Sequence, residues 1–531
     1  MNAPLPTNVD VLIVGSGINS LVCAALLARK GRKVCVLERE PVLGGCIRTD
    51  ELTLPGFRHD TLSTAHSLFL VGPAYAALGP ALHEAGLAYC RSEVPTGVLL
   101  PDGRIELLHT SRERNVARFE AAAAGDGAAY AAGLAEVQDN AELVFALLGN
   151  ELWSKATTKL LAGAVWKRGA HPLASFVGGS LGSCRHWLDG AVKGEGLRAL
   201  LAPWVLHTGL GPDSALSAMM SKVIAFSLEA VGIPFVQGGN ARSVEAFSRL
   251  IEAGKGSLHT GADVVRVLVR KGRATGVALA DGREISAKEV VCNVTPTQLY
   301  SRLLGHEALP PEVTRQATAY RYGKGNMQIH LALDTPPEWA EAALREVGYI
   351  HLSGGPEAVS KAVNEAERGL LPAKPTICVA QPSAVDSSRA PAGKAVLWIQ
   401  LPECPRVLRG DAASQLAVPV NGQWDETIRE AYADRVIDQL GRHLPDLKAS
   451  ILGRKVISPA DLQALNINLV GGDPYGGACD LDQSFLWRPL RATRNHETPI
   501  AHLWHIGAST HPGPGLGGTS GFHVAQRLGA A

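Results

Sequence analysis

Residues 14–22, VGSGINSLV, have the residue types and the spacing that hold the pyrophosphate of a dinucleotide. Gly15 permits a tight turn after a strand, and Gly17 lets the backbone approach the anion. A helix that begins near Ile18 would direct its free N–H groups and its dipole at the same point. Ser20 stands where a third glycine is usual, but that position requires only a small side chain. Two glycines also occur in plain packing turns, so the loop needs support from a second feature.

That support comes from an acid and a second glycine turn. Glu38 follows the loop by about 20 residues, at the end of an apolar run, where a carboxylate can bind ribose hydroxyls. An acid at this place favours an unphosphorylated ribose, and therefore FAD or NAD rather than NADP. Gly44 and Gly45, followed by Arg48, suit a loop that folds back over the same pyrophosphate, although a double glycine alone is more often an ordinary turn.

Apolar periodicity predicts the elements that position these residues. Residues 9–14 form a β-branched run of strand length, and residues 33–37 form another. Between them, Leu21, Ala24 and Ala28 belong to one helical face that begins at Asn19. The chain therefore opens with a strand, a glycine turn, a helix and a second strand.

Further along, residues 261–293 predict three short strands, and residues 98–108 predict a hairpin. The segment 110–232 has helical spacing, and 311–460 mixes helices with strands. The last thirty residues contain a strand, a dense glycine run and a short final helix. Because glycine-rich pieces lie at both ends and near the middle, we expect a cofactor domain assembled from separate segments.

Composition excludes several classes of protein. With 51 basic and 50 acidic residues in 531, the chain has no charge excess that would attract nucleic acid. We expect neither a secretory signal nor a transmembrane segment, and the nine scattered cysteines contain no CxxC pair. These features favour a soluble, cytoplasmic protein without a metal site. Oligomeric state and peripheral membrane contact stay open.

The motifs together resemble one family, the FAD-dependent oxidoreductases of the phytoene desaturase type, within a group that includes monoamine oxidases and Rab GDP-dissociation inhibitors. The resemblance rests on residues 14–49, on PGFRHDTLS at 55–63, on the central strand block and on the C-terminal glycine run. The most similar subgroup is that of pyridine nucleotide-disulfide oxidoreductase domain-containing protein 2, which shares the QSFLWRP and GASTHPGPG stretches. The resemblance is poor in the middle of the chain, where substrate specificity would lie.

The resemblance implies an α/β fold with a Rossmann-like FAD-binding domain of the glutathione reductase-2/amine oxidase type. This domain would comprise residues 1–75, 235–300 and 495–531. A substrate domain with a mixed sheet and helices would comprise 76–234 and 301–494.

The resemblance also assigns residues to FAD. Val264 would meet the adenine through its backbone, and the C-terminal glycines would bring N–H groups to the flavin. Helix N-terminal amides at that place stabilise the charge of a reduced flavin. The full set of expected FAD-binding residues is Gly15, Gly17, Ile18, Asn19, Ser20, Glu38, Arg39, Gly45, Cys46, Arg48, Val264, Asn293, Gly507, Gly515, Leu516 and Gly517.

Few residues are candidates for a catalytic role. His511, in the THPGPG stretch, and His66 are candidates for a catalytic role near the flavin, with structural roles as the alternative. Lys324 could resemble the lysine that holds a water near the flavin in amine oxidases, but a solvated lysine is the simpler interpretation. In the QSFLWRP stretch, the simplest expectation is a packing Trp487 and a surface Arg488.

The expected activity is removal of a hydride from a mainly apolar small molecule onto flavin N5, by a dehydrogenase, desaturase or oxidase. No second dinucleotide motif follows a strand, so oxygen or a quinone is the expected electron acceptor. Three alternatives remain: an amine oxidase, an FAD-dependent isomerase, and a non-catalytic lipid-binding protein of the GDP-dissociation-inhibitor type. An amine oxidase would need aromatic side chains beside the flavin, and only 5% of this chain is aromatic.

Overall fold

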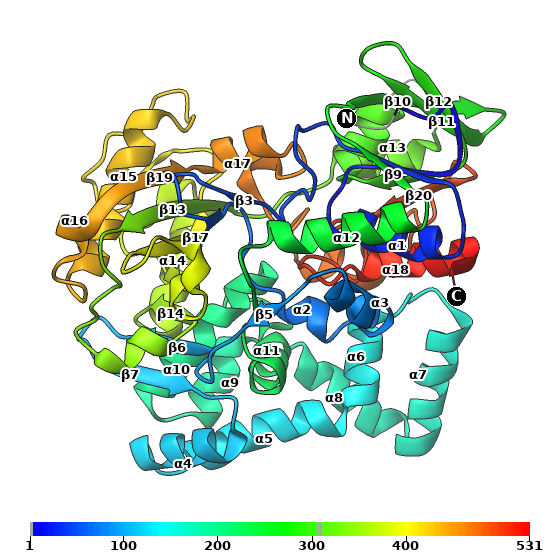
Figure 1. Ribbon diagram of the computed structural model, residues 1–531. Coiled ribbons are helices and arrows are strands. Elements are labelled where there is room, and N and C mark those ends of the chain that lie inside the picture. The colour runs from blue at the N-terminus through cyan, green and yellow to red at the C-terminus, as the bar shows by residue number, and fades with distance from the viewer. Residues whose placement is uncertain (1–3, 306, 308, 531) are drawn as a thin grey trace.

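The computed structural model describes residues 4–530 except 306 and 308. Two seven-stranded sheets lie side by side, and a group of helices lies below them in Figure 1. Both chain ends lie on the side of the first sheet. Residues 1–3 and 531, which fall within the expected FAD-binding domain, are outside the described part of the chain.

The first sheet has a parallel centre built from distant segments. Its strands are β1 (Asn8–Val14), β2 (Val34–Leu37), β9 (Ser257–His259), β10 (Val264–Arg270), β11 (Arg273–Leu279), β12 (Glu284–Asn293) and β20 (Leu503–Ile506). β1 pairs in parallel with β2 and β12, β2 with β9, and β20 with the C-terminal half of β12. β10 and β11 form an antiparallel extension beside the N-terminal half of β12. The predicted opening strands and the three-strand block are confirmed.

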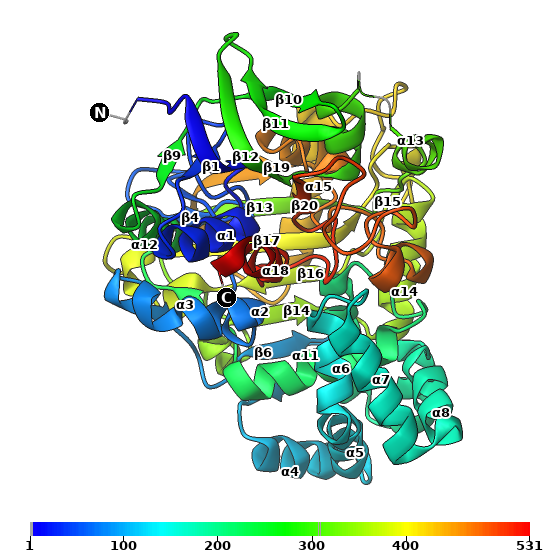
Figure 2. The ribbon, with the colours of Figure 1, turned by 90° about the vertical axis from the view of Figure 1, so that its right-hand side faces the viewer.

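One face of this sheet is covered by three helices that come from the start, middle and end of the chain. They are α1 (Ile18–Arg29), α12 (Ala241–Ala253) and α18 (Thr519–Ala525). α1 contacts both of the others, and it is buried from Ile18 to Ala28. Its alanines and Cys23 let the neighbouring helices approach closely, which larger side chains would prevent. Figure 2 shows α1 and α18 in contact.

The second sheet is largely antiparallel, in the order β19-β13-β17-β16-β14-β6-β7. Its strands are β6 (Thr96–Leu99), β7 (Ile105–Leu108), β13 (Gly325–Leu333), β14 (Tyr349–Leu352), β16 (Ile377–Ala380), β17 (Ala395–Cys404) and β19 (Ile451–Ile457). β6 and β14 form its parallel pair, and β6–β7 is the predicted hairpin. α14 (Pro356–Glu367) and α15 (Glu426–Gly441) pack beside this sheet. Three further strand pairs lie outside these two sheets: β3 (Thr49–Asp50) with β4 (His59–Asp60), β5 (Tyr89–Cys90) with β8 (Phe235–Val236), and β15 (Leu370–Leu371) with β18 (Gly410–Asp411).

The helical group corresponds to the stretch 110–232, whose spacing predicted helices, and it lies between β7 and β8 in the sequence. Its members are α4 (Arg112–Ala122), α5 (Asp126–Asp139), α6 (Ala141–Gly149), α7 (Lys155–Arg168), α8 (Ala170–Ser180), α9 (Cys184–Ala191), α10 (Glu195–Leu201), the 3₁₀ helix η1 (Ala202–Thr208) and α11 (Ser217–Val231). Other helices are α2 (Ser67–Leu70), α3 (Pro73–Glu84), α13 (Pro311–Thr318), α16 (Leu447–Ser450) and α17 (Pro459–Leu465). No helix in the described residues is both long enough and apolar enough to cross a membrane.

A buried arginine joins the two halves of the molecule. Arg389 is fully buried, and its guanidinium donates to Asp60 at 3.0 Å, to Asp386 at 2.9 Å and to the carbonyl of Val236 at 2.9 Å. These partners fix the loop before β17 against β4 and β8. All strands of the first sheet come from the segments predicted for the FAD-binding domain, and all strands of the second sheet come from those predicted for the substrate domain. The domain boundaries themselves stay a prediction.

Candidate functional site

The glycine loop and the acid are joined by a residue that the motif leaves unspecified. Ser16 donates its backbone N–H to Glu38 Oε2 at 2.9 Å and its hydroxyl to the same oxygen at 2.7 Å. The hydroxyl of Ser16 also accepts from the N–H of Gly44 at 2.8 Å. Glu38 Oε1 accepts from the N–H of Glu40 at 3.0 Å. One buried carboxylate therefore holds both glycine turns, and its remaining lone pair is available to a ribose hydroxyl.

The two turns form a cradle because neither has a side chain where they meet. Gly15 has a φ of +86°, a conformation that favours glycine. A Cβ on Gly45 would lie 3.2 Å from the Cα of Gly17, and Gly45 itself has a φ of +59°. A methyl group at this place would fill the space between the turns. The cradle therefore fits a phosphate that approaches the backbone closely.

Two helix N-termini face this space, and each follows a glycine that has no side chain to cap it. α1 begins after Gly17 and α18 after Gly518, and neither helix has an acid in its first turn. The N–H of Gly521 in α18 donates to Asn19 Oδ1 at 3.4 Å, so the N–H groups that precede it, together with those of the first turn of α1, remain to bind an anion or a developing negative charge. The hydroxyl of Ser520 donates to Asn19 Oδ1 at 2.8 Å, which fixes one N-terminus against the other.

Two predicted residues lie behind the lining rather than on it. Ser20 is fully buried, and its hydroxyl accepts from Asn293 Nδ2 at 2.9 Å. Gly507 approaches the other side of the same amide, because a Cβ there would lie 2.4 Å from Asn293 Oδ1. Ser20 and Gly507 thus position Asn293, which ends β12 at the cavity.

A single cavity of about 710 Å³ runs from the glycine turns into the region between α11 and the second sheet. Most of the predicted FAD-binding residues line it: Gly15, Gly17, Ile18, Asn19, Glu38, Arg39, Gly45, Cys46, Arg48, Val264, Asn293, Gly515, Leu516 and Gly517. These residues come from both ends and the middle of the chain, so the fold brings together what the sequence separates.

Cationic side chains concentrate at the cradle end of the cavity. Arg48 lies on the lining and forms a two-pronged ion pair with Asp50, at 3.0 and 3.3 Å. Arg302, which no motif indicated, also lines the cavity and donates to the carbonyl of Val264 at 3.1 Å. Burial lowers the pKa of Arg302, and the nearby charge of Arg39 adds to this effect. This end is suited to a ligand that carries phosphates.

The far end of the cavity is different in character. Its walls include the aromatic side chains of Trp204, Tyr349, Trp398 and Tyr475 and a row of aliphatic side chains from α11, such as Val223. Among the described lining residues the acids are Glu38, Glu40 and Asp263, and all three belong to the cradle end. The far end therefore presents an apolar, carboxylate-free surface with amide groups from β13 and β17 at its floor.

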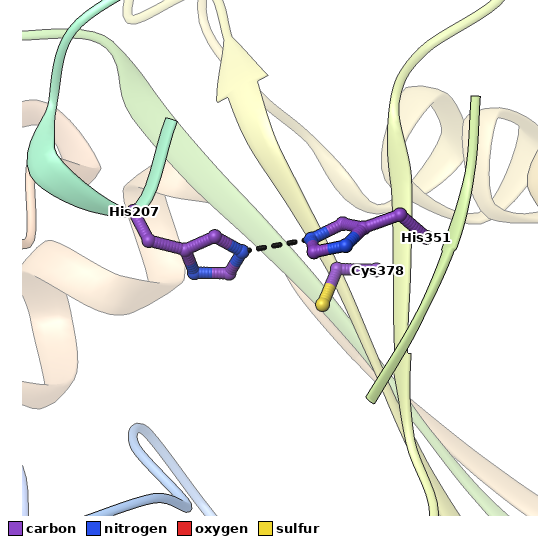
Figure 3. A group of neighbouring side chains, drawn as sticks. All are labelled: His207, His351 and Cys378. Carbon is purple, nitrogen blue, oxygen red and sulfur yellow. Dashed lines mark hydrogen bonds between the residues drawn. The ribbon is translucent and has the colours of Figure 1, made fainter. Parts of the chain in front are cut away.

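A pair of histidines stands at this far end, where Figure 3 shows their rings pointing at one another. Nε2 of His207 lies 2.9 Å from Nε2 of His351, so one ring donates and the other accepts. Burial lowers the pKa of His207 to about 4 and that of His351 well below its usual value, so both are neutral. Cys378, opposite His351 on the neighbouring strand, completes a group of donors that lie within 4.8 Å of one another. No sequence spacing indicated this group. Its atoms are of the kind that bind Zn²⁺ or copper, but the mutual hydrogen bond already accounts for their arrangement.

The two histidines predicted for catalysis are not on the described cavity wall. His66 is fully buried beside α2, and its Nδ1 lies 3.1 Å from the hydroxyl of Tyr89. His511 is buried against Phe485, with ring centroids 6.0 Å apart. Burial lowers the pKa of His66 to about 4 and that of His511 to about 3. The geometry gives neither residue contact with the cavity, and a catalytic role for them stays a prediction.

Two sequence expectations are wrong. Arg488 is buried rather than at the surface, and it donates to the carbonyls of Tyr475, at 2.6 Å, and Ala508, at 2.9 Å. It thereby ties the cavity wall to the C-terminal glycine run. Lys324 is not solvated, because its side chain is 13% exposed and its ammonium lies 3.4 Å from the carbonyl of Gly209. Contacts between distant loops bury both cations, and local sequence does not encode such contacts.

The family that this sequence matches binds a flavin, which agrees with a cavity whose cradle end suits a ligand with phosphates. Residues 21–454 match the model of the family described as flavin containing amine oxidoreductase. The rat protein named pyridine nucleotide-disulfide oxidoreductase domain-containing protein 2 is 27% identical, over 99% of this chain and 94% of its own length. The phytoene dehydrogenase of Streptomyces griseus is 27% identical, over 98% of this chain and 94% of its own length. These relatives confirm the resemblance drawn from the motifs.

Solved structures confirm the fold class. Putrescine oxidase bound to putrescine superposes with a TM-score of 0.59 at 17% identity, over 99% of this chain and all (100%) of that one. An oxidoreductase from Methanosarcina mazei has the same TM-score, 0.59, at 17% identity, over 97% of this chain and 100% of that one. At such identities the likeness concerns the fold alone.

Proposed function

The chain belongs to the flavin-containing amine oxidoreductases, and we propose that it removes a hydride from a carbon atom of a mainly apolar small molecule. It is an FAD-dependent oxidoreductase, and two bacterial proteins named phytoene desaturase are among its relatives. Bound FAD supplies the hydride acceptor. We propose oxygen or a quinone as the final electron acceptor, since the chain offers no second dinucleotide motif.

The observation that carries the proposal is the contrast between the two ends of the cavity. The cradle end has the N-termini of α1 and α18, neither with an acid in its first turn, and arginines, which match the phosphates and the flavin edge of FAD. The far end has aromatic and aliphatic walls that exclude water and would position an apolar substrate. Because the described far end has no carboxylate, it offers no counterion to an ammonium group.

The chain's own part in the reaction is placement rather than strong acid or base catalysis. The N-terminus of α18, which follows Gly518, provides amides that stabilise negative charge beside them. His207, neutral and on the wall, can hold a proton only weakly, because burial keeps its pKa near 4. A substrate whose C–H bond is weakened by a neighbouring double bond would suit such a site.

Amine oxidation is the second candidate, and the gathered aromatic side chains favour it. The four rings at the far end give this cavity more aromatic surface than the composition alone suggests. An amine that enters as the neutral base would not require a carboxylate partner. The two candidates therefore differ in which substrate reduces the flavin, a hydrocarbon or an amine.

The test is anaerobic bleaching of the purified, yellow protein with limonene, phytoene and putrescine as probes. We expect loss of flavin absorbance with a hydrocarbon and none with the amine. Ser227→Asp, on α11 at the cavity, should lower kcat/KM for the hydrocarbon at least about tenfold by placing a charge in an apolar wall.

Ser248→Asp is the matched control for this variant. Ser227 and Ser248 each donate to the carbonyl four residues before, at 2.8 and 2.9 Å, and Ser248 lies on α12 outside the described lining. Bleaching by putrescine alone would refute the proposal and establish the second candidate.

A further inference from the structure

Residues 153–183, which comprise α7 and α8, project from the molecule with almost no buried side chains. Thr157 is the one buried residue within this range, and α8 has none. Yet the range contains large apolar side chains that face solvent. Trp166 is 88% exposed, and the other exposed ones are Trp153, Leu161, Val165, Val177 and Leu181. Figures 1 and 2 both show α7 and α8 at the periphery of the helical group.

The helices α7 and α8 form a helical hairpin, here called the α7–α8 hairpin, whose charged side chains are all basic. No Asp or Glu occurs from residue 152 to residue 188, a stretch that contains Lys155, Lys159, Lys167, Arg168 and Arg185. The ammonium groups of Lys155, Lys159 and Lys167 form no ion pair with a carboxylate in the described part of the chain. A nearly neutral protein thus carries one locally basic and apolar projection.

The hairpin continues directly from the cavity wall. Phe145, Leu148 and Gly149 of α6 line the cavity, and α7 begins six residues after Gly149. Leu68 and Val71, from α2 and the turn that follows it, also line the cavity and are about half exposed, at 50% and 47%. The apolar hairpin and an apolar part of the cavity rim therefore belong to the same region of the molecule.

We propose that the α7–α8 hairpin docks on the surface of an anionic lipid bilayer. Helices of 14 and 11 residues are about 21 and 16 Å long, too short for a hydrocarbon core of about 30 Å, so they lie in the interface. Trp166 and the aliphatic side chains enter the headgroup region, and the free lysines pair with anionic lipids. A partner protein would have to match the same charge, but a lipid surface satisfies both the scattered apolar groups and the lysines without shape complementarity.

Vesicle flotation of the whole flavoprotein tests the docking without any substrate. Vesicles of phosphatidylglycerol and phosphatidylcholine should bind the protein, and vesicles of phosphatidylcholine alone should bind it at least about tenfold more weakly. Trp166→Glu should weaken binding to the anionic vesicles about tenfold, and the triple change of Lys155, Lys159 and Lys167 to Gln should do the same. Retained flavin colour shows that each variant is folded.

Two controls match these changes outside the hairpin. Val420→Glu alters another fully exposed apolar residue, and the change of Lys255, Lys271 and Lys374 to Gln removes three other exposed lysines. Both controls should bind as the wild type does. Equal binding to neutral vesicles, equal loss in the controls, or a dimer that ignores vesicles would each overturn the docking proposal.

Docking would hold the neighbouring cavity rim at the bilayer surface, where an apolar substrate could enter from the lipid, and this consequence rests on the proposed function. It predicts that Trp166→Glu lowers turnover of a hydrocarbon presented in vesicles but leaves turnover of the same hydrocarbon in detergent unchanged. If the wild type floats with vesicles and no hydrocarbon bleaches the flavin, the proposed function fails and the docking stands.

Discussion

Replacing Glu38 by glutamine tests the central arrangement of the cofactor cradle. The carboxylate accepts two bonds from Ser16 on Oε2 and one from the N–H of Glu40 on Oε1. In Glu38→Gln one of these oxygens becomes an NH₂ group of nearly the same size. A donor then faces a donor at one side of the site, while the other side keeps a neutral acceptor.

The free-energy cost of Glu38→Gln follows from these three hydrogen bonds. Loss of charge on the acceptor removes about 1 kcal/mol from each bond to Ser16, and the orphaned N–H costs about 1–3 kcal/mol. The total is about 3–5 kcal/mol. Since 1.4 kcal/mol corresponds to a factor of ten, a loss expressed only in FAD affinity would be at least on the order of 100-fold.

Two measurements separate the free energy lost from folding from the free energy lost from FAD binding. Urea unfolding of the apoprotein gives the part lost from the fold, and flavin fluorescence quenching gives the change in the Kd for FAD. We expect the two losses to add to about 3–5 kcal/mol. Glu252→Gln is the control, because Glu252 is exposed on α12 and lies outside the described lining of the cavity. A combined loss below about 1 kcal/mol, or an equal loss in the control, would refute the reasoning.

Three further predictions concern stability. Gly521→Ala puts a methyl group 1.8 Å from the backbone of α1 and should destabilise the fold by about 3 kcal/mol or more in urea unfolding, whereas Gly441→Ala, with nothing within 4 Å, should be neutral. Arg389→Ala leaves two buried carboxylates without their cation and should cost about 3–5 kcal/mol; a loss under 1 kcal/mol in the same assay would contradict the buried network. Burial lowers the pKa of His66 and of His207 to about 4, below the ordinary value of 6.5, so the unfolded chain takes up protons first as the pH falls. The free energy of unfolding should therefore decrease between about pH 6.5 and 4, and a flat profile across this range would show that these histidines are charged in the fold.

Much of the cradle could be predicted from the sequence because it depends on neighbouring residues. Gly15, Gly17 and Glu38 belong to one strand–turn–helix–strand unit, where backbone geometry and spacing restrict the choice of residue. The glycine run before α18 was identified by resemblance and lies at the same cavity. The predicted strands of the central block and the hairpin were recognisable because alternating apolar residues and DG turns are local signals.

The far end of the cavity could not be predicted in this way. His207 and His351 are 144 positions apart, and only the packing of η1 on the second sheet brings their rings to 2.9 Å. Burial of Arg488 depends on carbonyl groups of two separate loops, which no local pattern records.

By itself the sequence determined the strand–turn–helix–strand unit and its dinucleotide cradle, because both rest on short-range constraints on the backbone, and the family resemblance of its motifs indicated the α/β class and FAD. Only the tertiary structure decided which side chains face the substrate. It places four aromatic residues from distant elements at one end of the cavity, and the acids of the described lining lie at the other end. The physical reason is that burial and charge separation depend on which surfaces meet, and in this chain those surfaces come from segments hundreds of residues apart.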